Sequence, residues 1–366
     1  MRFLLLHLGT RGGGPQVQVE IANAINRSAA DEALVAFDSS SEMRSALLAV
    51  APTCLEVGGE RSAGWFGAVR RVSSLMKDTR RIVQFCRKSG IDIVFEPMGH
   101  PLQAYVRWRL RRQRIPVITS IHDAVRHAGE ESTILSLIAG RDLTDTDGVM
   151  TYSSAVAEQL RAQHVPVFET VHGAFGANDS QRARRYPERR VVVGFFGRIE
   201  KYKGISRLIS AAEILRERGV PIELCIVGRG ALSDRDRERL NELEAQVDNR
   251  WIAESEIGAT IRSFDVLALP YDEASQSGVV GFAWNEGVPI VATPVGGLAE
   301  QVQAGGGIVA EELSDVAFAD AVAQLVSDPA LYAEVSRTQL DAARSAFSWD
   351  RVARDIASAG REVLAR

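Results

Sequence analysis

The chain has 366 residues, of which 46% are hydrophobic and 25% are charged, and its formal net charge is −4 at pH 7. This length predicts two domains, because one hydrophobic core seldom organises so many residues. The composition is typical of a globular protein, and no apolar run is long enough to cross a bilayer, which excludes a helical membrane-spanning protein.

The charges are unevenly distributed along the chain. Residues 1–115 hold 17 Lys and Arg against 10 Asp and Glu, whereas the whole chain holds 43 against 47. A basic first third indicates an anionic surface or partner for that part, while the mild overall acidity argues against RNA or DNA binding. The cysteines Cys54, Cys86 and Cys225 show no metal-binding spacing, and a low odd count is typical of the reducing cytoplasm.

The first predicted element is a strand, Arg2–Leu8, which has neither the apolar length nor the cleavage site of a signal peptide. Gly12, Gly13 and Gly14 follow it, and apolar residues then recur at helical spacing up to Ile25. A strand, a glycine loop and a helix together let backbone N–H groups approach an anion. The spacing matches neither G-x-G-x-x-G nor a Walker loop, so a tight turn without a ligand is the alternative.

Two basic helices are predicted in the first half. Residues 66–88 carry seven Lys or Arg and one Asp, and residues 105–112 carry four Arg with Tyr105 and Trp108. Such helices can lie on an anionic membrane surface with their aromatic side chains inserted and their cations toward the headgroups. The alternative is a solvated helix face with Trp108 packed inward.

A strand predicted at Val117–Ile121 ends at His122. Open parallel sheets place ligand-binding groups at the carboxyl ends of their strands, so His122 is a candidate site residue. A purely structural histidine is the alternative. Strands at 148–152 and 167–171 complete the first half, and the loss of periodicity that follows predicts an interdomain linker over residues 176–190.

The second half opens with the predicted strand Val191–Phe196, which runs into a loop with Arg198 and Lys203 and then into a helix from Ile205. Two cations at a strand end suit a diphosphate, because the guanidinium forks onto phosphate oxygens and the ammonium acts as a point charge. The alternative is that both are ordinary loop charges.

Further loops in this half carry small residues after predicted strands. The strand 222–227 ends at Gly228 and Gly230, and residues 233–247 read as a charged helix. After the strand 265–269, small and polar residues precede a helix and form a second candidate anion site at its N-terminus: Ser275, Gln276, Ser277, Gly278 and Val279. Strand and helix alternate in both halves, which predicts two doubly wound α/β domains that face each other across a cleft.

Three stretches of the second half, residues 196–204, 224–230 and 287–297, resemble the retaining glycosyltransferases of GT-B fold, specifically glycosyltransferase family four. The resemblance covers nearly the whole chain. It implies two Rossmann-like domains, residues 1–175 on the acceptor side and 191–346 on the donor side. It also implies a last helix, residues 347–366, that crosses back to the first domain.

The resemblance also implies an activity and the residues that perform it. A sugar passes from a nucleotide diphosphate donor to an acceptor with retention of anomeric configuration. Arg198 and Lys203 hold the diphosphate, amides near Ser277 support it, the turn at Gly228–Gly230 lies near the base and ribose, and His122 faces the sugar. No cofactor is implied, and because no D-x-D-like loop follows a strand, we expect no metal ion.

At two positions the sequence departs from many members of the family. Ala274 and Phe282 stand where those members carry glutamates that contact the sugar and the ribose. The local text, like residues 122–130, resembles a subgroup of bacterial polysaccharide-building enzymes. This resemblance implies a glycan or lipid-linked acceptor and a cytoplasmic enzyme at the inner face of the cell membrane. A GT-B nucleotide-sugar epimerase and a catalytically silent nucleotide-binding scaffold are the alternatives.

Overall fold

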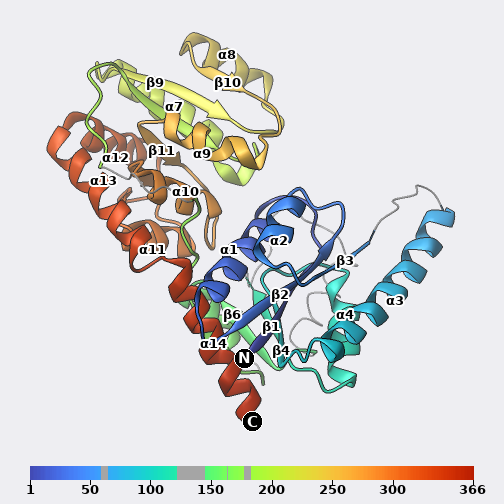
Figure 1. Cartoon of the computed structure of the whole chain (residues 1–366). Coiled ribbons are helices and arrows are strands. Elements are labelled where there is room, and N and C mark those ends of the chain that lie inside the picture. The colour runs from blue at the N-terminus through green and yellow to red at the C-terminus, as the bar shows by residue number, and fades with distance from the viewer. Residues whose placement is uncertain (59–64, 122–144, 163, 177–182) are drawn as a thin grey trace. The chain divides into compact units, whose positions relative to one another are not determined.

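The computed structural model describes residues 1–58, 65–121, 145–162, 164–176 and 183–366 (Figure 1). These residues form two compact units. Unit 1 comprises the described residues up to Val171 together with Trp349–Arg366, and unit 2 comprises those of His172–Ser348. The prediction for His122 falls outside the described residues.

Unit 1 is built on a seven-stranded parallel sheet in the order β3-β2-β1-β4-β5-β6-β7. Its strands are β1 Arg2–His7, β2 Glu32–Asp38, β3 Cys54–Val57, β4 Ile93–Glu96, β5 Val117–Ile121, β6 Gly148–Thr151 and β7 Val167–Glu169. Its helices before residue 172 are α1 Gly13–Arg27, α2 Arg44–Val50, α3 Trp65–Lys88, α4 Gln103–Arg112 and α6 Ser154–Leu160. The central strand β1 is fully buried from Phe3 to Leu6, because both faces of the sheet are covered.

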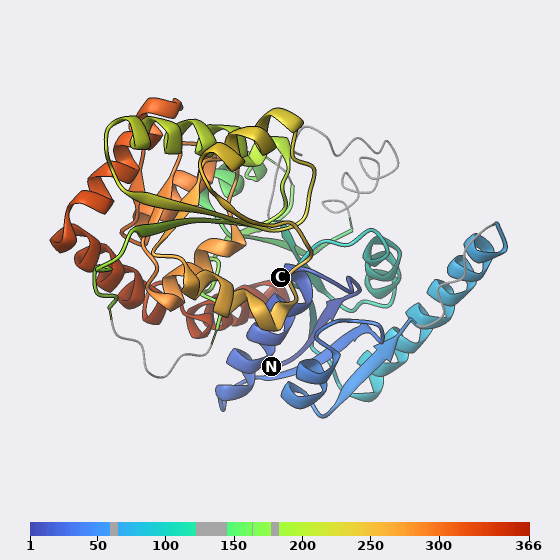
Figure 2. The same cartoon turned by 90° about the horizontal axis from the view of Figure 1, so that it is seen from above.

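Unit 2 is built on a six-stranded parallel sheet in the order β10-β9-β8-β11-β12-β13. Its strands are β8 Val191–Phe196, β9 Ile222–Val227, β10 Gln246–Asp248, β11 Val266–Leu269, β12 Ile290–Ala292 and β13 Ile308–Val309. Its helices are the short 3₁₀ helix η1 Lys201–Lys203, α7 Ile205–Glu217, α8 Asp234–Glu242, α9 Glu254–Ser263, α10 Gly278–Glu286, α11 Gly296–Ala304, α12 Asp315–Ser327 and α13 Pro329–Arg344. α7 packs against α12, and α10 packs against α9 and α13, so helices cover both faces of the sheet (Figure 2).

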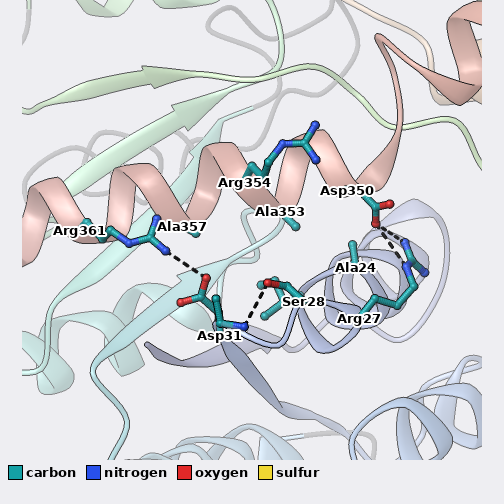
Figure 3. A pocket seen from close by; sticks show the side chains of 11 residues that line it. Ala24, Arg27, Ser28, Asp31, Asp350, Ala353, Arg354, Ala357 and Arg361 are labelled. Carbon is teal, nitrogen blue, oxygen red and sulfur yellow. Dashed lines mark hydrogen bonds and ion pairs between the residues drawn. The ribbon is translucent and has the colours of Figure 1, made fainter.

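The last helix, α14 Trp349–Ala365, follows unit 2 in the chain but belongs to unit 1, where it packs along α1. Its apolar stripe buries Val352 and Ile356 completely. Two ion pairs flank the contact, Arg27 with Asp350 at 2.6 Å and Arg361 with Asp31 at 3.2 Å, and they border a cavity of about 560 Å³ between the two helices (Figure 3). The expected crossover of the last helix is therefore confirmed.

The predicted pair of doubly wound α/β domains is also confirmed, but one predicted element is wrong. The charged segment 233–247 is not a single helix, because α8 ends at Glu242 and the edge strand β10 begins at Gln246. Glu244 separates them with a left-handed φ of 54°, a conformation that ends a helix. An edge strand needs no apolar face, and Val247 is 42% exposed, so hydrophobic periodicity gives no sign of β10.

Part of the predicted linker packs on unit 2. Arg184 donates hydrogen bonds to the carbonyl oxygens of Phe264 (2.8 Å), Arg262 (2.7 Å) and Glu286 (3.2 Å). Its own backbone N–H donates to Ser336 Oγ at 2.8 Å. These bonds hold residue 184 to α13 and to the ends of α9 and α10. Across the described residues, none of the helices combines the length and the apolar character needed to cross a bilayer.

Candidate functional site

The loop after β8 carries the two predicted phosphate-binding cations. Arg198 is exposed, and its neighbours in the loop are fixed by backbone bonds to the end of β9. Gly197 N–H donates to Val227 O at 3.1 Å, and Ile199 N–H donates to Arg229 O at 2.9 Å. Lys203 is the last residue of η1 and is half-buried. The backbone on either side of Arg198 is therefore fixed while its guanidinium faces solvent.

The two glycines after β9 allow this loop to approach. A side chain on Gly228 would place its Cβ 1.8 Å from Gly197 O, and one on Gly230 would place its Cβ 2.1 Å from Ile199 O. Asn249 completes the turn, accepting from Gly230 N–H at 3.1 Å and donating to Gly230 O at 2.9 Å. Gly228 and Gly230 therefore have a clear packing role, and their predicted place near a base and ribose remains a proposal.

Tyr271, just after β11, joins the cationic loop to the rest of the site. Lys203 Nζ lies 3.7 Å from the centroid of the Tyr271 ring, which is only 1% exposed. Gly204 lets the backbones meet here, since a Cβ on it would lie 1.9 Å from Pro270 O. Asp272 N–H also donates to Tyr202 O at 2.8 Å. The carboxyl ends of β8 and β11 are thus held together.

The N-terminus of α10 lies on the other side of Tyr271. Ser277 is the N-cap residue, and its Oγ lies 3.1 Å from the hydroxyl of Tyr271. Gln301 from α11 holds the Ser277 backbone in both directions, with Ser277 N–H to Gln301 Oε1 at 2.9 Å and Gln301 Nε2 to Ser277 O at 3.2 Å. Within the part of the chain that the structure describes, the buried Ser275 Oγ has no hydrogen-bond partner. The first N–H groups of a helix attract anions, so a ligand oxygen fits here.

An acidic side chain near the site is neutralised by its neighbour. Asp272 accepts from Arg207 at 2.7 Å, and the same guanidinium reaches Asp315 at 3.0 Å. Arg207 is only 14% exposed, so this ion pair is partly shielded from water. The pairing offsets the negative charge of Asp272 beside the loop that carries Lys203.

The predicted glycine loop lies in unit 1 and has a structural support that the sequence did not reveal. Gly12 N–H donates to the Glu42 carboxylate at 2.6 Å, so this amide already binds an internal anion. The ring of His7, 3% exposed, fills the space beneath the loop. A Cβ on Gly9 or Gly14 would lie 2.3 Å or 2.2 Å from His7 Nε2. The sequence signal for this support is a histidine at the end of a predicted strand, His7, followed by glycines at positions 9 and 14.

Ala274 and Phe282, which stand where many family members carry glutamate, pack against neighbouring groups. Ala274 is 8% exposed, and its carbonyl oxygen lies against Gly296, where a Cβ would approach it to 2.3 Å. Phe282 stacks on Phe175 with ring centroids 4.8 Å apart. The nearby Glu286 forms a bidentate pair with Arg262, both bonds at 2.8 Å. Glu286 is therefore already paired with Arg262, and Ala274 and Phe282 carry no carboxylate.

The second basic helix, α4, is less available than its sequence implied. Arg107 is 1% exposed and donates to Glu96 at 2.6 Å and to Thr119 at 2.7 Å inside unit 1. Arg111 pairs with Asp147 at 3.1 Å. Only Arg109 and Arg112 remain around the half-buried Trp108, with their guanidinium carbons 5.8 Å and 4.6 Å from its ring centroid. Because Arg107 satisfies a buried carboxylate, α4 offers fewer cations to an anionic surface than its four arginines suggest.

Two cavities of unit 1 lie away from the strand ends that bind ligands. One, between α1 and α14, includes residues that precede β2, and the other, of about 860 Å³, includes residues that precede β4, β5 and β6. Both are thus at the amino ends of the strands, whereas open parallel sheets bind ligands at the carboxyl ends. We therefore place the candidate site at the carboxyl ends of β8, β9 and β11.

The fold and this site define a two-domain α/β protein of GT-B type. Two solved structures share the fold over the whole chain. HepE from Anabaena, in complex with UDP-glucose, matches with a TM-score of 0.72 at 17% identity, covering 99% of this chain and 100% of that chain. Sucrose-phosphate synthase from Thermosynechococcus elongatus matches with a TM-score of 0.70 at 18% identity, covering 100% and 99%.

A comparison of sequences classifies unit 2 more specifically. Residues 190–328 match the family model described as "Glycosyl transferases group 1", so unit 2 carries a domain of this group. A D-inositol 3-phosphate glycosyltransferase from Corynebacterium glutamicum (strain R) is 30% identical over 199 residues, which cover 51% of this chain and 47% of the relative. The chain spans about half the length of the first curated relatives that it matches.

Proposed function

We propose that the chain is a glycosyltransferase whose nucleotide diphosphate-sugar donor binds to unit 2. The observation that supports this most directly is the contact series from Lys203 through Tyr271 to Ser277, which links an ammonium group to a helix N-terminus, two groups that each attract an anion. The group 1 domain over residues 190–328 and the UDP-glucose in HepE point to the same class of donor. Uridine diphosphate is therefore the first nucleotide to test.

The site suits the departure of a diphosphate. When the bond between the anomeric carbon and the phosphate oxygen breaks, negative charge builds on the leaving diphosphate. Arg198, Lys203 and the amides of Gly278 and Val279 are preorganised groups that stabilise this charge, which is the largest effect available to such a site. No step of this scheme requires a metal ion or a cofactor. Retention of configuration and a role of His122 at the sugar complete the proposal.

The acceptor is proposed to be a glycan or a lipid-linked sugar of cell-surface polysaccharide or glycolipid assembly. The relative from C. glutamicum favours a second candidate, because its name gives D-inositol 3-phosphate as the acceptor. Incubation with each acceptor and a nucleotide-sugar radiolabelled in its sugar, followed by chromatographic removal of the donor, shows whether the label enters a glycan or lipid-linked product or a D-inositol 3-phosphate product. Label in an isomer of the donor, without any acceptor, would support an epimerase instead.

The proposed contact with a cytoplasmic anionic membrane surface is best supported by α3. Its described exposed residues are dominated by cations, namely Lys77, Arg80, Arg81, Arg87 and Lys88, with Met76 42% exposed beside them. Each such cation near an anionic surface contributes about 1 kcal/mol. We expect co-sedimentation with phosphatidylglycerol vesicles and not with phosphatidylcholine vesicles. The double substitution Lys77→Glu and Arg80→Glu should abolish it, and unchanged sedimentation would contradict this part of the proposal.

The donor site is tested by thermal unfolding with UDP, GDP, ADP, CMP and dTDP in turn. A ligand at about 100 times its Kd adds roughly 2.7 kcal/mol, a shift of several degrees. We expect one diphosphate to give this shift and Arg198→Ala to remove it, with a loss of roughly 10²–10³ in turnover. Arg337→Ala, which removes an exposed arginine of α13, is the matched control. A shift without sugar transfer to any acceptor would favour the silent scaffold, and no shift with any nucleotide would contradict the proposed donor site.

A further inference from the structure

We propose that Tyr271 is a positioning residue that couples Lys203 to the N-terminus of α10, so that the two anion-binding groups act as one site. This inference rests on the proposed function. Its ring lies under Lys203 Nζ at 3.7 Å, and its hydroxyl lies 3.1 Å from Ser277 Oγ. A single buried side chain therefore touches both groups that the diphosphate is proposed to contact.

The ring fixes a side chain that is otherwise mobile. Lysine has a flexible four-carbon stem, and ordering it when a ligand binds costs conformational entropy. An ammonium over an aromatic face is already held before the ligand arrives. The ring itself has little freedom, since Tyr271 is 1% exposed and its carbonyl oxygen accepts from Thr293 Oγ1 at 2.6 Å. Lys203 is thus preorganised through Tyr271.

The hydroxyl of Tyr271 acts on the N-terminus of α10 by contacting its N-cap residue. A serine at the N-cap ordinarily accepts a hydrogen bond from an amide of its own first turn. Ser153, Ser233 and Ser314 do so, with their side chains accepting from Val156, Asp236 and Ala317. Ser277 makes no such bond, and Tyr271 contacts its hydroxyl instead. Because the Ser277 side chain is turned to Tyr271, it does not occupy the α10 amides that a phosphate oxygen would use.

The test compares the binding of UDP with that of uridine, which lacks the phosphates. Tyr271→Phe removes only the hydroxyl and should weaken UDP binding about 2- to 10-fold, the range of one lost hydrogen bond. Tyr271→Leu also removes the ring and should weaken it roughly 10- to 100-fold. Both variants should bind uridine as the wild type does, because the base and ribose contacts remain.

A double-mutant cycle of Tyr271 and Ser277 tests whether the coupling depends on the contact between their hydroxyl groups. Ser277→Ala should leave UDP binding close to that of the wild type, because no hydroxyl remains to occupy the α10 amides, and adding it to Tyr271→Phe should restore the UDP affinity that Tyr271→Phe loses. Tyr332→Phe is the matched control, because this buried tyrosine of α13 donates to Asp265 O at 3.1 Å and makes no contact with Lys203 or Ser277. It should lower stability and leave UDP affinity unchanged.

The outcomes separate the inference from the proposed function. If Arg198→Ala binds UDP as tightly as the wild type, or if the wild type binds none of the five nucleotides, the donor site itself is wrong and the coupling falls with it. If another diphosphate binds in place of UDP, the same comparison uses that diphosphate and its nucleoside. If Arg198→Ala loses UDP while both Tyr271 variants keep it, only the coupling is overturned. Equal losses of UDP and uridine would also overturn it, since they would show general disorder of unit 2. Should Tyr271→Leu fail to fold, the cycle with Tyr271→Phe still decides.

Discussion

Gly228 has no room for a side chain, which makes it a sensitive residue of the site. Its φ is +141° and a Cβ would lie 1.8 Å from Gly197 O. We predict that Gly228→Ala lowers the free energy of unfolding of unit 2 by about 3 kcal/mol or more, because backbone must move on both sides. Urea unfolding followed by far-UV circular dichroism measures this change.

The matched control for that substitution is Gly219→Ala. Gly219 also has a positive φ, +72°, but within the described residues no atom lies within 4 Å of the Cβ it would gain. Only the left-handed conformation is then unfavourable, at a cost of about 1 kcal/mol. If Gly228→Ala and Gly219→Ala lowered the free energy of unfolding equally, the close approach of the loops after β8 and β9 would not contribute to stability.

Glu20 of α1 predicts a specific pH dependence. Burial raises its pKa from the usual 4.5 to about 7, against a smaller opposing effect of Arg27. Between these two values the folded protein keeps the proton while the unfolded chain has lost it. The free energy of unfolding should therefore fall by about 3 kcal/mol as pH rises from 4.5 to 7, and should change no further above 7 from this group.

Glu20→Gln tests this assignment, because glutamine does not titrate. Urea unfolding at pH 5 and at pH 8 should show a smaller loss of stability across this interval in the variant than in the wild type. Glu158→Gln, at an exposed position of α6, controls for the removal of one carboxylate. The same pH dependence in wild type and Glu20→Gln would mean that burial does not hold the proton on Glu20.

At the scale of elements, α14 is held to unit 1 by its apolar stripe more than by its charges. Ile356 is fully buried, so Ile356→Ala should cost about 2–5 kcal/mol. Arg27 and Asp350 form a short pair, but their side chains are 58% and 55% exposed. Arg27→Gln should therefore cost less than about 1 kcal/mol. Comparable losses in the two variants by urea unfolding would contradict this ranking.

The elements that sequence patterns predicted are those with buried faces. β8, β9 and β5 begin and end where predicted, because most of their residues are apolar and pack in a core. The edge strands β10 and β13 were not predicted, because they have only three and two residues, none of them fully buried. The edge strand β7 was predicted at residues 167–171. α10 was predicted from its small N-terminal residues, and the structure begins it at Gly278.

The candidate site was predictable in its charged, glycine and small polar residues. Arg198, Lys203 and Ser277 stand at strand ends or a helix start, where local sequence shows them. Tyr271 and Gln301 were not identified, because their importance comes from contacts between β11, η1, α10 and α11 that are distant in sequence. Arg107 shows a second limit of sequence analysis. A pattern of basic residues on a helix cannot reveal that one of its arginines pairs with the buried Glu96.

At the scale of the whole molecule, the division into two units predicts two unfolding transitions. Each unit has its own sheet and buried core, and the groups proposed to bind UDP, Arg198, Lys203 and the N-terminus of α10, lie in unit 2. A ligand stabilises only the part that it binds, by roughly 2.7 kcal/mol at 100 times its Kd. We therefore expect calorimetry to show two transitions, of which UDP raises only one.

Ile356→Ala assigns the transitions, because α14 belongs to unit 1 although it follows unit 2 in the chain. The substitution should lower the midpoint of the transition that UDP leaves unchanged. Arg198→Ala should leave both midpoints where they are without ligand and should remove the shift that UDP causes. If UDP and Ile356→Ala moved the same transition, the two units would unfold together. In that case α14 would couple the stabilities of both units and would not stabilise unit 1 alone.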